Sequence, residues 1–111
     1  MLLRGVLAAA ILLVLVPAAA GTTPRVITER DSGKTFRVAR GHELTLRLSN
    51  RYVWTGPRVR GRAVLLTSVN YFMDPGFREW TIHARARGAV RISAAGSGGT
   101  SRLFRIRVIV P

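Results

Sequence analysis

The sequence of 111 residues contains no cysteine at all. A chain without thiols cannot form disulfides, zinc–thiolate sites or a cysteine nucleophile. Acidic and imidazole side chains are also scarce, with five Asp plus Glu and two His. Few groups therefore remain for acid–base chemistry or metal binding, and stability has to come from the apolar core.

The few reactive groups are not spaced as a catalytic or metal site. His42 and Glu43 are adjacent, and neighbouring strand residues point to opposite faces of a sheet. The segment Gly96–Gly99 lacks the Gly-Lys-Ser/Thr ending of a phosphate-binding loop. No helix is predicted that could carry the nucleophile elbow of a serine hydrolase. We therefore predict no enzyme activity, no catalytic residue, no metal site and no cofactor.

The N-terminal residues 1–20 are predicted to be a signal peptide. A basic start at Arg4 precedes an unbroken apolar run, Val6–Val16, and small residues follow at Pro17–Ala20. This run is shorter than the roughly 20 residues of a membrane-spanning helix. An uncleaved anchor is the alternative, and it is the only membrane contact that we predict. The expected location is secreted or associated with the cell envelope.

The chain after the signal peptide is predicted to be a short flexible lead, residues 21–24, and one domain, residues 25–111. No segment of this domain keeps a helical period. Short β-rich runs recur instead at intervals of about 8–12 residues, which is typical of an all-β sandwich. We expect about seven short antiparallel strands, with the hairpin loop 96–101 before the last one.

The centre of the sandwich is predicted from residues 42–54. Leu44, Leu46 and Leu48 alternate with polar residues, as in a strand with one buried face. A second strand follows a tight loop, and we expect Trp54 on it to pack in the core. Trp80 is expected to meet it from the facing sheet. Phe77 follows the turn Asp74-Pro75-Gly76 and is expected either to fill the core or to contact a partner.

Positive charge dominates the sequence, with 18 Lys plus Arg and a net charge of +13. Nearly all of it is guanidinium, because Lys34 is the only lysine. One interpretation is an anionic partner, and the other is a solvated surface that discourages edge-to-edge pairing of strands. The residues expected to point outward from one sheet are Arg37, Arg91, Arg105 and Arg107. No specific nucleic-acid partner is predicted.

Six framework motifs follow one another between residues 28 and 110. In chain order they are Asp31-Ser32-Gly33-Lys34-Thr35-Phe36, Gly41-His42-Glu43-Leu44-Thr45-Leu46-Arg47-Leu48, Tyr52-Val53-Trp54, Trp80-Thr81-Ile82, Ala86-Arg87-Gly88-Ala89-Val90-Arg91-Ile92 and Phe104-Arg105-Ile106-Arg107-Val108. Their order resembles the chagasin-like family of secreted cysteine-protease inhibitors. The resemblance implies an immunoglobulin-like β-sandwich that blocks papain-type proteases with three loops at one end.

The three inhibitory loops of that family are degenerate in this sequence. Ser49-Asn50-Arg51 stands where the family has Asn-Pro-Thr-Thr-Gly, and the turn before Phe77 has one glycine in place of a glycine-rich loop. Gly96–Ser101 replaces the loop that carries Arg-Pro-Trp. The resemblance assigns protein binding to Asn50, Arg51, Pro75, Gly76, Phe77, Ser97, Gly98 and Gly99. The alternative function is a basic extracellular module that binds anionic cell-envelope polymers through its arginine-rich sheet face.

Overall fold

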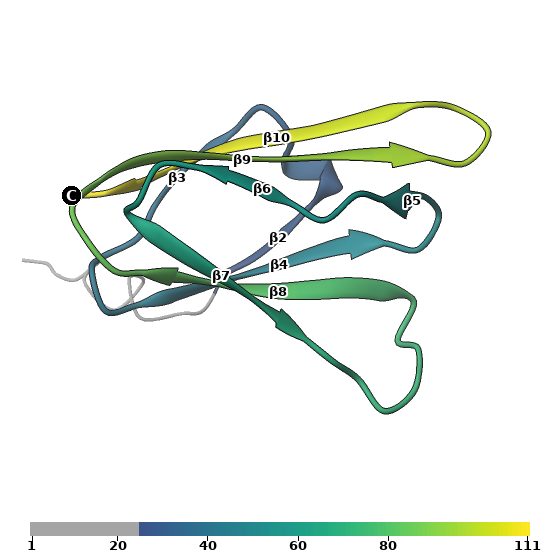
Figure 1. Ribbon diagram of the computed structural model, residues 1–111, viewed down its shortest axis with the longest axis horizontal. Helices are drawn as coiled ribbons and strands as arrows, with labels where there is room; N and C mark the ends of the chain where they lie inside the picture. Colours follow the sequence, from purple (N-terminus) through teal and green to yellow (C-terminus); the bar gives the residue numbers. More distant parts are fainter. Residues whose placement is uncertain (1–24) are drawn as a thin grey trace, which may run out of the picture.

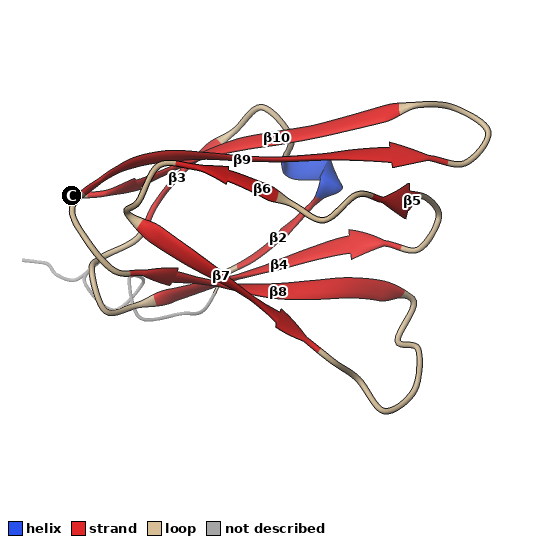
Figure 2. Ribbon diagram, in the orientation of Figure 1, coloured by secondary structure: helices blue, strands red, loops and turns tan. Residues whose placement is uncertain are grey.

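Two β-sheets pack face to face around an apolar interior (Figures 1 and 2). The computed structural model describes residues 25–111, so the predicted signal peptide and flexible lead lie outside the described residues. The strands are β2 (Val26–Thr28), β3 (Thr35–Arg37), β4 (Glu43–Ser49), β5 (Val53–Trp54), β6 (Arg58–Arg60), β7 (Val64–Val69), β8 (Phe77–Ala84), β9 (Gly88–Ser97) and β10 (Arg102–Val110). A 3-10 turn, η2 (Glu29–Asp31), follows β2.

The two sheets differ in size. One has the order β3-β10-β9-β5, with β6 also paired to β9, and the other has the order β2-β4-β8-β7. The longest hairpin, β9–β10, is antiparallel along its whole length, from Arg102 opposite Gly96 to Val110 opposite Gly88. Within residues 25–111, no helix is long and apolar enough to cross a membrane.

Alternation along the strands explains why the sheets pack. In β4, Leu44, Leu46 and Leu48 are 7%, 0% and 0% exposed, while the residues between them face outward. Trp54 on β5 and Trp80 on β8 are 4% and 6% exposed, so both predicted core positions are confirmed on facing sheets. An apolar set at every second residue buries one face of each sheet and leaves the other in water.

Three details differ from the expected sandwich. Residues 25–111 form nine strands rather than about seven. One that was not expected is β6, because its Arg-Val-Arg sequence has a single apolar residue and so shows no alternation of apolar and polar positions. The edge strands β2 and β3 pair in parallel with β4 and β10, so the sheets are not wholly antiparallel. Gly96 and Ser97 belong to β9 and not to the hairpin loop, because they pair with β5.

Candidate protein-binding end of the sandwich

Three connecting loops lie at the same end of the sandwich, on the right in Figure 1. They are the β4–β5 loop (residues 50–52), the β7–β8 loop (residues 70–76) and the β9–β10 loop (residues 98–101). Each follows a strand that runs toward this end, so the topology brings together segments far apart in the sequence. These three loops are called the loop end below.

The β4–β5 loop contacts both of its neighbours. The Asn50 backbone N–H donates to the carbonyl oxygen of Gly76 at 3.0 Å, and its side-chain amide donates to the Asp74 carboxylate at 2.7 Å. On the other side, a Cβ atom placed on Gly98 would lie 3.2 Å from the carbonyl oxygen of Arg51. The three loops therefore form one row, and residues predicted from all three sequence segments share one surface.

The β4–β5 loop is fixed from below by Trp54. The indole Nε1–H donates to the carbonyl oxygen of Ser49 at 2.8 Å, and the Tyr52 ring lies 5.4 Å from the Trp54 ring. Arg102 adds its guanidinium above Tyr52, 5.9 Å from the ring centroid. A short loop held by a buried side chain has few alternative conformations, which lowers the ordering cost of binding.

The β7–β8 loop is fixed at its base by a polar cluster on the outer face of its sheet. Glu79 Oε1 accepts hydrogen bonds from the Tyr71 hydroxyl at 2.6 Å and from Arg47 Nε at 2.8 Å. The Tyr71 ring meets Phe77 edge-on at 5.7 Å, and the Arg47 guanidinium lies over Phe77 at 4.6 Å. Asp74 also accepts from the Gly76 N–H at 2.8 Å, closing the turn before β8.

Phe77 does not fill the core, the first of the two places expected for it, and its contact with a partner stays a prediction. It is half-buried on the outer face of the four-stranded sheet, between Tyr71 and Arg47, and it does not enter the core. The reason is register, because β8 buries Trp80 and Ile82 and so turns Phe77 and Glu79 outward. Phe77 therefore supports the loop from beneath.

Two residues that were not predicted as contacts dominate the surface of this loop. Phe72 is 103% exposed and Met73 is 76% exposed, while the Tyr71 and Asp74 side chains on either side are tied down by hydrogen bonds. Two adjacent large apolar side chains without cover form a contiguous exposed patch, and such patches mark interaction sites. The apolar triplet before the strong turn Asp74-Pro75-Gly76 was the available signal. An apolar run next to a strand is expected to continue that strand, whereas β7 ends at Val69.

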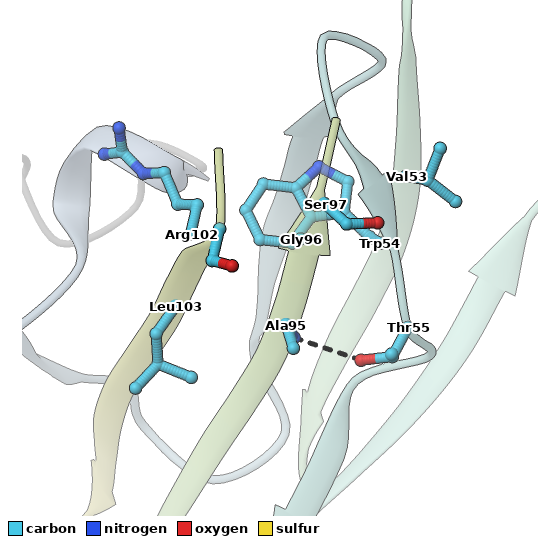
Figure 3. A pocket seen from close by; sticks show the side chains of 9 residues that line it. Val53, Trp54, Thr55, Ala95, Gly96, Ser97, Arg102 and Leu103 are labelled. Atoms are coloured by element: carbon cyan, nitrogen blue, oxygen red, sulfur yellow. Dashed lines mark hydrogen bonds between the residues drawn. The ribbon is translucent and has the colours of Figure 1, made fainter. Parts of the chain in front are cut away.

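A shallow groove of about 590 Å³ adjoins the β9–β10 loop (Figure 3). Val53 and Leu103, which are 75% and 55% exposed, line it together with Ser97. Below the groove the Trp54 ring packs against Gly96, and the Thr55 hydroxyl accepts from the Ala95 N–H at 3.0 Å. Ser97, one of the predicted contact residues, therefore stands at the rim of an apolar depression.

The Glu79 cluster shifts the pKa values of all three of its polar members, Glu79, Tyr71 and Arg47, the last of which is raised by its hydrogen bond to Glu79. Burial alone would raise the pKa of Glu79, but the hydrogen bonds from Tyr71 and Arg47, with the charge of Arg47, hold it below its ordinary 4.5. Donation to Glu79 raises the pKa of the Tyr71 hydroxyl above its ordinary 10.0. At neutral pH the cluster therefore holds a carboxylate, a guanidinium and a protonated hydroxyl.

Acidification should lower the free energy of unfolding of the domain, because it protonates Glu79. Because its pKa is lower in the folded protein than in the unfolded chain, its contribution to stability is present above pH 4.5 and is lost as the pH falls through the lowered pKa. We expect urea unfolding to show a free energy that declines on acidification, and Glu79→Gln to make that decline shallower.

Asp31 limits how far Glu79→Gln can flatten the acid profile. Burial alone would raise its pKa, but donation from the Thr28 backbone and from Lys34 holds it below its ordinary 3.8. Part of the acid dependence should therefore persist in Glu79→Gln. Tyr71→Phe keeps the ring against Phe77 and should give an intermediate slope. Identical profiles for wild type and Glu79→Gln would contradict the role assigned to this carboxylate.

The predicted polyanion residues lie on a different surface from the loop end. Arg37, Arg91, Arg105 and Arg107 are exposed on β3, β9 and β10, all in the five-stranded sheet. Their predicted outward placement is confirmed. Among residues 25–111, no group of three or more His, Asp or Glu side chains is arranged to hold a metal ion.

Comparison with solved structures shows the same fold in three proteins. The cysteine protease inhibitor EhICP2 from Entamoeba histolytica superposes with a TM-score of 0.60 at 18% identity, over 78% of this chain and 94% of that one. Amebosin gives 0.59 at 19% identity, over 80% and 99% of the two chains. PbICP-C, solved in complex with falcipain-2, gives 0.52 at 12% identity, over 78% and 99%.

Comparison by sequence finds no such neighbour. No protein-family model matches the chain, and no curated protein matches it. The likeness is therefore one of fold, and it confirms the chagasin-like, immunoglobulin-like sandwich expected from the framework motifs.

Proposed function

We propose that this protein inhibits papain-type cysteine proteases by seating its loop end in the active-site cleft. The observation that carries the proposal is the joined row of three loops with the exposed pair Phe72–Met73 at one side. The fold shared with the inhibitor EhICP2 and with PbICP-C, which was solved bound to falcipain-2, supports the same choice of partner.

The β4–β5 loop cannot carry most of the contact. Only residues 50–52 separate β4 from β5, and Trp54 and Asn50 hold this loop close to the sheet ends. The flanking loops are longer, and the β7–β8 loop offers the apolar side chains. Binding energy at protein interfaces is concentrated in a few such anchors. Phe72 and Met73 are therefore the anchors of the proposed interface, with Gly98 and Gly99 on the opposite side.

The loop end suits inhibition because its exposed residues are held in place before binding. Hydrogen bonds from Asn50 to Asp74 and Gly76, and from Tyr71 to Glu79, brace the segment that presents Phe72 and Met73. A braced loop loses little conformational entropy when it enters a cleft. The predicted signal peptide would bring the protein to proteases outside the cytoplasm.

The double variant Phe72→Ala/Met73→Ala tests this proposal. We expect the wild-type protein to inhibit papain or a related enzyme at submicromolar concentration, measured with a fluorogenic peptide substrate. Removing two anchors worth about 1 kcal/mol each should weaken inhibition about 30-fold. The matched control is Leu65→Ala, which removes a 46% exposed apolar side chain from β7, away from the loop end.

Two results would overturn the proposal. Wild-type protein that leaves papain and two other papain-type enzymes fully active at micromolar concentration is not such an inhibitor. Equal inhibition by the double variant and the wild type would show that Phe72 and Met73 are not the anchors. Both side chains are exposed, so the double variant should unfold at the same temperature as the wild type.

A further inference from the structure

The outer face of the five-stranded sheet carries positive charge without any compensating carboxylate. Six arginines, all exposed, project from four of its strands, and together they are called the arginine face: Arg37, Arg58, Arg60, Arg91, Arg105 and Arg107. Two of them, Arg58 and Arg60, lie on β6, the strand that was not predicted from the sequence. None of the chain's five Asp and Glu residues lies on a strand of this sheet.

The opposite sheet is built differently. Its outer face carries Glu43 and Glu79, and each is paired, with His83 at 3.0 Å and with Arg47 at 2.8 Å. Among residues 25–111, no guanidinium of the arginine face lies within ion-pair distance of a carboxylate. If the arginines reflected only a compositional bias of the sequence, the outer faces of both sheets should carry similar amounts of unpaired positive charge. The folded chain instead concentrates unpaired charge on one of them.

The register of the strands places like charges directly opposite one another. Arg91 on β9 pairs with Arg60 on one side and with Arg107 on the other, so three guanidiniums form a row across three strands. Ser93 stands in the next row between Arg58 and Arg105. Directly opposed like charges destabilise a sheet, and a bound anion would relieve this repulsion.

Small side chains on β9 leave a depression along the middle of this face. Outward positions Ala89, Ser93 and Ala95 alternate with Arg91, and a shallow depression lies among Arg60, Ala89, Arg91 and Arg107. The arginines of β6 and β10 flank this strip. Neighbouring rows are about 6.7 Å apart along a strand, so an extended polymer lying on β9 would meet guanidinium groups in two successive rows, those of Arg91 and Ser93.

We propose that the arginine face binds a linear polyol-phosphate polymer, independently of the loop end. Guanidinium groups suit phosphate because their planar fork donates two parallel hydrogen bonds. A phosphodiester shares one negative charge between two non-bridging oxygens that point in different directions, so it can accept hydrogen bonds from both flanking strands at once. The outward positions of β3, β6, β9 and β10 include no aromatic side chain on which bases could stack. This absence favours a polymer without bases over single-stranded nucleic acid.

The test compares two triple variants that remove the same charge. Arg60→Gln/Arg91→Gln/Arg107→Gln neutralises the central row, and Arg40→Gln/Arg85→Gln/Arg87→Gln neutralises three exposed arginines in turns outside the strands. Binding to purified poly(glycerol phosphate) is measured across a salt series. We expect the first triple variant to bind at least about 10-fold more weakly, with a salt slope flatter by about 2, and the second to change little.

Other binding results would contradict a part of the proposal. Salt-independent binding, or equal losses in both triple variants, would show that no localised anion surface exists. Tighter binding of an oligo(dT) with the same number of phosphates would assign the face to nucleic acid. Equal binding of polyglutamate would mean that phosphate is not recognised as such. Unfolding temperature shows that the variants fold, and papain inhibition unchanged by the Arg60/Arg91/Arg107 variant would separate this surface from the loop end.

Discussion

Replacing Trp54 by alanine should lower the free energy of unfolding by about 3–5 kcal/mol. The side chain is 4% exposed and lies between the sheets, so its loss leaves a cavity that the strands cannot fill. It also removes the indole donor from the Ser49 carbonyl oxygen. A domain of this size is stable by about 5–15 kcal/mol, so urea unfolding should show a much lower midpoint.

Trp54→Phe and Val53→Ala make this prediction specific. Trp54→Phe keeps an aromatic ring but removes the shorter of the two hydrogen bonds to the Ser49 carbonyl oxygen, leaving the one from the Tyr52 N–H at 3.4 Å, which should cost about 1 kcal/mol. Val53 is adjacent in sequence but 75% exposed, and Val53→Ala should stay within about 0.5 kcal/mol of wild type. A Trp54→Ala protein as stable as Val53→Ala would refute the core position of this tryptophan.

Replacing Gly96 by valine should destabilise the domain by about 2–3 kcal/mol. A Cβ atom at this position would lie 2.9, 3.0 and 3.1 Å from three ring carbons of Trp54, inside normal carbon–carbon contact. Valine is a better strand residue than glycine, so local propensity predicts the opposite sign. Thermal and urea unfolding of Gly96→Val distinguish the two.

Gly56 provides the matched control, because a Cβ atom there would meet nothing within 4 Å. Gly56→Val should change the free energy of unfolding by no more than about 0.5 kcal/mol. If the Trp54 ring causes the clash, Gly96→Val should cost less in a Trp54→Phe background, with a coupling of at least about 0.5 kcal/mol. If the effects of Gly96→Val and Trp54→Phe on the free energy of unfolding are additive, the Trp54 ring is not the cause of the destabilisation.

The candidate site was only partly predictable from the sequence. The resemblance to chagasin-like inhibitors located the three loops, and the structure joins them through Asn50, Asp74 and Gly98. Phe72 and Met73 were missed because an apolar run next to a strand is expected to continue the strand. They are exposed because β7 ends at Val69 and because the hydrogen bond from Tyr71 to Glu79 holds the chain in a loop at this point.

The arginine face was also only partly predictable from the sequence. Alternation predicted that Arg91, Arg105 and Arg107 would point outward, since their neighbours are apolar. Strand pairing alone decided that Arg60 and Arg107 flank Arg91. Pairing depends on register between segments distant in the chain, which the period of one strand does not contain.

The sequence by itself determined the all-β sandwich, the buried faces of its longer strands and the core positions of Trp54 and Trp80. These follow from a period of two and from side-chain hydrophobicity, both of which are local. Only the tertiary structure decided that Gly96 is a strand residue under Trp54 and that the arginines gather on one sheet. Those features depend on which strands become neighbours, and strand neighbours are fixed only when segments distant in the sequence pair and the two sheets pack together.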